Sequence, residues 1–310
     1  MNIMDSWVNI AIRFILYMDL MLLFGLPLFG LYALQHHERR SLHITRQFSA
    51  ILGGAAVVGI VMSLLSMLVL AKMMTGAEDY FSVSRHAFEM IVSGTALGAA
   101  WVLRLVALSV ALVVTPLLVR RPTYGFAITA SAGLIALATL AWGGHGAMDS
   151  GGKGVLHLSA DILHLAAAGG WVGALTAFVL LLRVNHASPN QQFELLQRTL
   201  AGFAAIGTMI VLTLTATGLI NYGMISGLTL SGLTSTLYGQ LLLTKLGFFA
   251  LMLALAGANR FHLTPRLEEK MRIGDHVGAI AALRKSLLIE SGAATAILLL
   301  VSVLGLQSPQ

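Results

Sequence analysis

Three polar side chains on one predicted helix are the residues of this chain best placed to bind a metal ion. His157, Asp161 and His164 lie in the apolar segment 155–182 and are spaced i, i+4 and i+7. At about 100° per residue, this spacing puts all three on one face of a helix. Neutral imidazole nitrogens can bind copper or zinc, and a nearby carboxylate can orient an imidazole. The two histidines lie about 10 Å apart along such a helix, so we interpret them as two successive sites on a path.

The glycine-rich loop before this helix adds two further candidate ligands, His145 and Met148. Thioether sulfur suits Cu(I), and imidazole suits both copper oxidation states. The chain contains no cysteine, which excludes disulfides, thiolate metal sites and thiol nucleophiles. We therefore predict that His145 and Met148 capture a copper ion and that the helix passes it along. Two alternatives stay open: the polar stripe forms a proton relay or structural network, or its histidines bind haem.

The composition is that of a protein that lies mostly in a lipid bilayer. Of 310 residues, 57% are hydrophobic and 10% are charged, and the mean hydropathy is +0.85. Soluble domains carry about 25% charged residues, and one membrane span needs about 20 apolar residues. We predict an all-α polytopic membrane protein that is a single integral membrane domain over residues 1–310. Its eight predicted spans are 8–34, 48–73, 95–119, 124–142, 155–182, 196–222, 238–258 and 286–306.

The basic residues between the spans predict how the bundle is oriented. Thirteen Lys and Arg side chains lie in one set of loops, and three lie in the other set. Cytoplasmic loops carry an excess of Lys and Arg, so the first set faces the cytoplasm. Both termini and the loop of His145 then lie on the outer, periplasmic side. The net charge of +6 follows this distribution, so we expect no nucleic-acid partner.

Further ionisable residues lie inside the predicted spans, where an Asp, Lys or Arg costs about 2.5–3.5 kcal/mol at a helix centre. They line a polar path through the bundle, or they form structural ion pairs such as Arg104 with Asp19 and Lys245 with Glu290. Trp171 falls near the middle of the membrane, within a run of small residues that allows close helix approach. We expect Trp171 to line the interior of the bundle.

Several motifs of this chain resemble those of the CopD family of bacterial inner-membrane copper proteins. The resemblance covers most of the chain from Thr95 to Leu306, and the motifs are specific when taken together. They are GGH at 143–145, DxxH at 161–164 running into AAAGGWVGAL, TxxGxxWxxR at 95–104, YGQLLLTKLGFF…NRFHLTPRL at 238–267, and SLLIESGAATAILLLVSVLG in the last span.

The resemblance implies an eight-helix bundle in the inner, cytoplasmic membrane that brings copper inward and works with a periplasmic copper carrier of the CopC type. It singles out motif positions without saying which of them touch metal. These positions are His145, Asp161, His164, Trp171, Arg104, Lys245, Asn259, Arg260 and Glu290. Many relatives carry a fused CopC-like domain, and because we identify none in this sequence we expect a separate carrier or direct uptake.

We therefore expect copper transport from periplasm to cytoplasm, contributing to copper resistance and homeostasis, with no enzymatic activity. The sequence contains no ATP-binding loop, so transport would be facilitative or ion-coupled. Two other functions stay open. One is a haem-binding protein or a membrane reductase of Cu(II), and the other is a non-transporting sensor or scaffold that docks a copper carrier.

Overall fold

The computed structural model describes residues 3–77, 79–144, 149–183, 189–226, 232–259, 261 and 276–307. These residues form helices and no strand. Among them are eight helices long and apolar enough to cross a membrane, which confirms the predicted polytopic all-α fold. The eight are α1 (Ile3–Tyr32), α3 (Leu42–Thr75), α5 (Ala96–Val114), α7 (Pro122–Ala138), α8 (Gly151–Leu181), α9 (Pro189–Ser226), α11 (Leu237–Ala258) and α13 (His276–Leu304).

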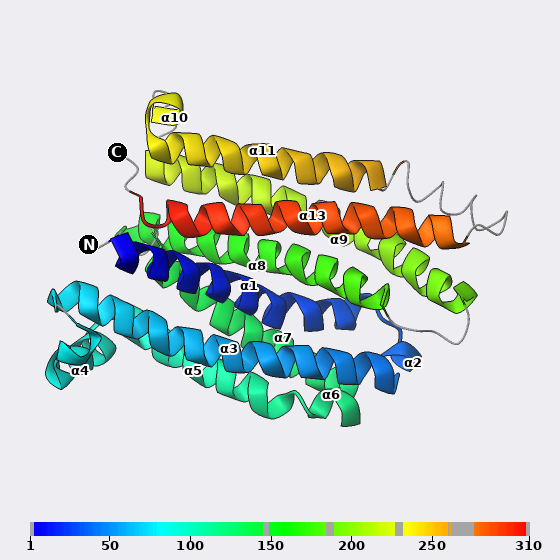
Figure 1. Cartoon of the computed structure of the whole chain (residues 1–310), viewed down its shortest axis with the longest axis horizontal. Helices are drawn as coiled ribbons and strands as arrows, with labels where there is room; N and C mark the ends of the chain where they lie inside the picture. Colours follow the sequence, from blue (N-terminus) through cyan, green and yellow to red (C-terminus); the bar gives the residue numbers. More distant parts are fainter. Residues whose placement is uncertain are drawn as a thin grey trace.

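Short helices mark the two ends of the bundle (Figure 1). One end holds both chain termini together with α4 (Arg85–Gly94) and α10 (Gly232–Ser235), and we name it the terminal end. The opposite end holds α2 (His36–Arg39) and α6 (Leu117–Arg120). We name it the arginine end, because both short helices there end in arginine.

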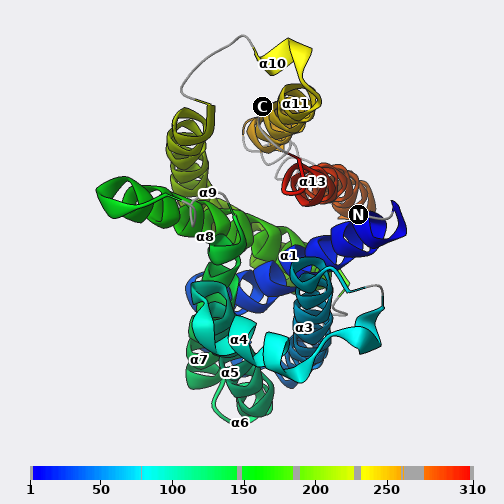
Figure 2. The same cartoon turned by 90° about the vertical axis from the view of Figure 1, so that its left-hand side faces the viewer.

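Helix α1 lies at the centre of the bundle and packs against α3, α7, α8 and α13 (Figure 2). Its closest approach is to α8, where a Cβ atom on Gly25 would collide with the backbone of Gly169 and would lie 2.9 Å from Cα of Gly173. The small residues of α8 therefore let two helix backbones touch. At its other end, α1 is tied to the residues that follow α13, because Arg13 donates from Nη1 to the carbonyl oxygen of Gly305 at 3.2 Å.

The largest apolar side chains pack in the half of the bundle nearest the arginine end. Phe29 of α1 meets Phe178 of α8 edge to face, with ring centroids 5.1 Å apart. Phe48 of α3 meets Phe126 of α7 in the same way, at 6.0 Å. All four rings are fully buried. The polar residues of α8 lie in the other half, toward the terminal end.

Helices α9 and α11 are the least buried of the spans. Helix α9 packs along α8, and α11 packs along α13. The two helices diverge from each other, as Figure 2 shows. A cavity lies among these helices, and side chains from α8, α9, α11 and α13 line it.

Candidate functional site

The predicted polar stripe of α8 is present, and each of its three residues has a hydrogen-bond partner from outside the stripe. His157 contacts Asp149 just before α8. Asp161 and His164 contact Asn221 and Thr217, which both lie on α9. The side chains of the stripe are therefore held in place by hydrogen bonds, as expected for polar groups in an apolar helix bundle.

His157 is buried and oriented by a carboxylate. Its Nδ1 lies 2.7 Å from Oδ2 of Asp149, and its side chain is 2% exposed. Its Nε2 has no hydrogen-bond partner in the described part of the chain. With the Nδ1 proton donated to Asp149, Nε2 carries a free lone pair, which is the arrangement that proteins use to present an imidazole to a metal ion.

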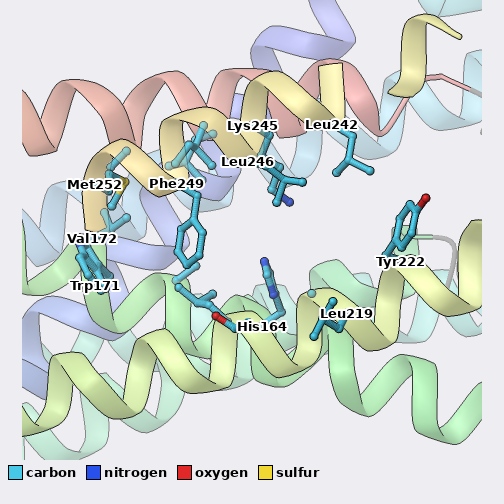
Figure 3. Close-up of a pocket in the computed structure, with 17 residues that line it drawn as sticks. His164, Trp171, Val172, Leu219, Tyr222, Leu242, Lys245, Leu246, Phe249 and Met252 are labelled. Atoms are coloured by element: carbon cyan, nitrogen blue, oxygen red, sulfur yellow. The ribbon is translucent and has the colours of Figure 1, made fainter. Parts of the chain in front are cut away.

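The tautomer of His164 follows from its partner. Thr217 donates its hydroxyl proton to the carbonyl oxygen of Thr213 at 2.6 Å, so its oxygen is left to accept a proton from Nδ1 of His164 at 2.9 Å. His164 therefore carries its proton on Nδ1, and Nε2 is the nitrogen with a free lone pair. Figure 3 shows the ring of His164 pointing into the cavity.

Two cavities meet at His164. The terminal cavity, of about 210 Å³, lies toward the terminal end and includes Asp161, Asn221 and Tyr238 in its lining. The apolar cavity, of about 390 Å³, continues toward the arginine end and is lined mostly by apolar side chains. His164 and Lys245 line both cavities. The imidazole of His164 therefore stands where a polar chamber gives way to an apolar one.

The far wall of the apolar cavity contains Trp171 and Met252 (Figure 3). Trp171 is 3% exposed and packs edge to face against Phe203 of α9 at 6.2 Å. It therefore lines the interior of the bundle, as expected. Its Nε1 has no partner among the described residues. Met252 is also buried and contributes a thioether, a soft ligand group, to the same wall.

Asp19, Arg104 and Glu290 lie apart from this site, and neither of the suggested ion pairs is formed within the described residues. Arg104 donates from Nε to Oγ1 of Thr139 at 2.7 Å rather than to Asp19. Asp19 is buried, and its Oδ2 accepts no hydrogen bond from the described residues. Glu290 accepts a hydrogen bond from Nδ2 of Asn259 rather than pairing with Lys245.

Two of the predicted ligands, His145 and Met148, lie outside the described residues. Within the described ranges, no three His, Asp or Glu side chains come together as a complete metal site. His157 is not among the residues that line the two cavities, whereas Asp161, His164 and Lys245 line the terminal cavity together. Of the three residues of the predicted stripe, His157 therefore lies apart from both cavities, whereas Asp161 and His164 line the terminal cavity together.

The partners that α9 supplies were not predicted from the sequence. Thr213, Thr217 and Asn221 are spaced four residues apart in the sixth span and therefore share one face of α9. That face supplies the donor to Asp161 and the acceptor for His164. The spacing of polar residues at i, i+4 and i+8 in an apolar span is the signal that would have identified them.

Two family models match this chain. The model described as "Copper resistance protein D-like, N-terminal domain" matches residues 4–155, and the model described as "Copper resistance protein D" matches residues 197–304. The first match runs from α1 through α7 to the first residues of α8. The second includes most of α9 together with α11 and α13. No match was found among solved structures.

Three bacterial proteins are similar to this chain. Copper resistance protein D of Pseudomonas syringae pv. tomato is 45% identical over 99% of this chain and 98% of its own length. Inner membrane protein YebZ of Escherichia coli (strain K12) is 28% identical over 84% of this chain and 86% of its own length. Copper transport protein CutJ of Bacillus subtilis (strain 168) is 38% identical over 34% of this chain and 18% of its own length. This multi-pass membrane protein belongs to the copper resistance protein D, or CopD, family.

Proposed function

We propose that this protein conducts copper through the cytoplasmic membrane, from the outer side toward the cytoplasm, along α8. The observation that carries the proposal is the free Nε2 of His164 at the junction of the two cavities. Asp161 adds a carboxylate on the same face of α8, which lowers the cost of bringing a cation into an apolar bundle. The proposal includes no enzymatic step.

The proposed direction is supported by where the charges and cavities lie. The terminal end carries Lys72, Arg85 and Lys153, whereas most basic loop residues in the described part of the chain belong to the arginine end. The positive-inside rule places the arginine end in the cytoplasm. The terminal cavity then lies toward the outer side, and copper passes from Asp161 and His164 toward Met252 and the cytoplasm.

The first ligands on this path are histidines near the terminal end. His157 presents its free Nε2, and His145 and Met148 belong to the adjacent loop in the sequence. His157 and His164 are separated by about 10 Å along α8, so an ion leaves one before it is held by the other. As the family resemblance implies, we expect a separate carrier of the CopC type to deliver copper to this end.

The test is copper entry into proteoliposomes, measured with Cu(I) and with Cu(II). We expect His164→Ala to abolish flux, because no other described imidazole lines the two cavities. His86→Ala is the matched control, since His86 is exposed on α4 at the terminal end, and it should leave flux unchanged. Copper that binds to the wild-type protein without any flux would overturn the transport proposal in favour of a sensor or scaffold.

A further inference from the structure

Lys245 is a basic side chain in the wall of both cavities, and it forms no hydrogen bond there with the other described residues. It comes from α11, opposite α8, and Figure 3 shows its amine pointing into the space that His164 enters from the other side. Within the described residues its Nζ makes no hydrogen bond or ion pair. A lysine inside a spanning helix is costly, and such residues usually mark a functional path or pair with another group.

The other charged groups of the terminal cavity come from α1 and α8. Arg13 is held at Gly305, and Asp161 is held by Asn221. Tyr238 of α11 also lines this cavity, and the charge of Asp161 acts on both Tyr238 and Lys245. The lining of the terminal cavity thus contains two basic side chains, Arg13 and Lys245, and one carboxylate, Asp161.

This charge balance is unexpected for a place where a cation binds. A copper ion between Asp161 and His164 would be repelled by the ammonium of Lys245, and in an apolar interior this repulsion is only weakly screened. The ammonium is therefore well placed to act as a substitute cation. An ammonium on the flexible lysine stem can lie near Asp161 when copper is absent and can move away when copper arrives.

We propose that Lys245 is a tethered competitor of copper, which weakens the site at Asp161 and His164 so that a bound ion can leave it. The inference rests on the proposed function of that site. Conduction requires binding that is favourable enough for an ion to enter and weak enough for it to leave. A histidine and a carboxylate with no opposing charge would hold copper in the bundle, and the nearby amine of Lys245 weakens that binding.

The experiment compares Lys245→Gln with Lys245→Arg in the full-length purified protein. Cu(I) affinity is measured by competition with a chromophoric chelator, and flux is measured in proteoliposomes at saturating copper. Lys245→Gln should bind Cu(I) about tenfold more tightly or more and should conduct it more slowly, because the repulsion is gone. Lys245→Arg keeps the charge and should stay near wild-type affinity. Lys153→Gln, at an exposed lysine of α8, is the matched control.

A second neutral variant, Lys245→Leu, shows whether an effect of Lys245→Gln comes from the lost charge or from the polar amide of glutamine. Lys245→Leu should also bind Cu(I) more tightly than wild type. Unchanged or weaker affinity in both neutral variants would overturn the role of Lys245. His164→Ala tests the underlying site separately. If His164→Ala abolishes binding while the neutral variants match wild type, only the competitor role fails, and if His164→Ala leaves affinity unchanged, the proposed copper site itself fails.

Discussion

The hydroxyl of Thr217 determines which nitrogen of His164 is free. Its oxygen lies 2.9 Å from Nδ1 of His164, and its proton goes to the carbonyl oxygen of Thr213 at 2.6 Å. A hydroxyl on α9 thus directs the lone pair of an imidazole on α8 into a cavity. The hydrogen bond also links α8 to α9 at the depth of the candidate site.

Replacing Thr217 with Val keeps the shape of the side chain and removes this hydrogen bond. We expect Cu(I) affinity to fall by about 10- to 100-fold, the usual loss when the group that orients a metal-binding histidine is removed. Thr217→Ser should restore most of the affinity in the same chelator competition assay. Thr213→Val is the control, because the side chain of Thr213 bonds only to its own helix, at the carbonyl oxygen of Met209. Equal affinities for Thr217→Val and wild type would contradict this role.

Asp149 has the corresponding role for His157 near the terminal end. Asp149→Ala removes the acceptor 2.7 Å from Nδ1, so the imidazole loses its fixed tautomer and orientation. We expect weaker copper capture and slower uptake at low copper concentration, with recovery at high concentration. Initial rates in proteoliposomes measure this. Asp79→Ala changes another loop carboxylate at the terminal end and should have no effect on uptake; a similar loss in both variants would argue against a specific role for Asp149.

Gly25 is placed where no larger residue fits. In Gly25→Ala the new methyl group would meet the backbone of Gly169, which cannot move aside as a side chain can. We expect a loss of about 1–3 kcal/mol of stability, as is typical of overpacked cores. Thermal unfolding in detergent measures it. Gly54→Ala on α3 is the control, because nothing lies within 4 Å of the new atom there, and it should be neutral or slightly stabilising.

Glu290 distinguishes a structural role from a place on the copper path. It is buried, accepts a hydrogen bond from Asn259 and lines neither cavity. Glu290→Gln keeps the side-chain volume and removes the negative charge, so we expect unchanged Cu(I) affinity and flux. Asp161→Asn, the matched change in the terminal cavity, should lower both. A comparable loss of flux in Glu290→Gln would place Glu290 on the path.

The number of spans and the polar stripe of α8 could be predicted because both are local properties of the sequence. Apolar length fixes where helices can cross a bilayer, and the spacing of His157, Asp161 and His164 fixes the face on which they lie. The run of small residues at Gly169 and Gly173 likewise indicated a close helix contact before its partner, Gly25, was known.

The partners of the charged residues could not be predicted in this way, because they depend on which helices are neighbours. Arg104 is satisfied by the side chain of Thr139 at the end of α7, and Glu290 is satisfied by the amide of Asn259. Opposite charges suggested ion pairs, but a neutral acceptor or donor at the right place serves as well. The two cavities have no sequence signature, since four helices contribute to the lining of the apolar one.

The link between Arg13 and Gly305 has a consequence for biosynthesis. The two residues are 292 positions apart, and the partners of Gly25 lie on α8, the fifth span. Synthesis proceeds from the N-terminus, so α1 is made long before its packing partners on α8 and its hydrogen-bond partner at Gly305 exist. The central helix of the bundle must therefore be inserted first and completed last, and a chain truncated before α13 would leave Arg13 without the carbonyl group to which it donates.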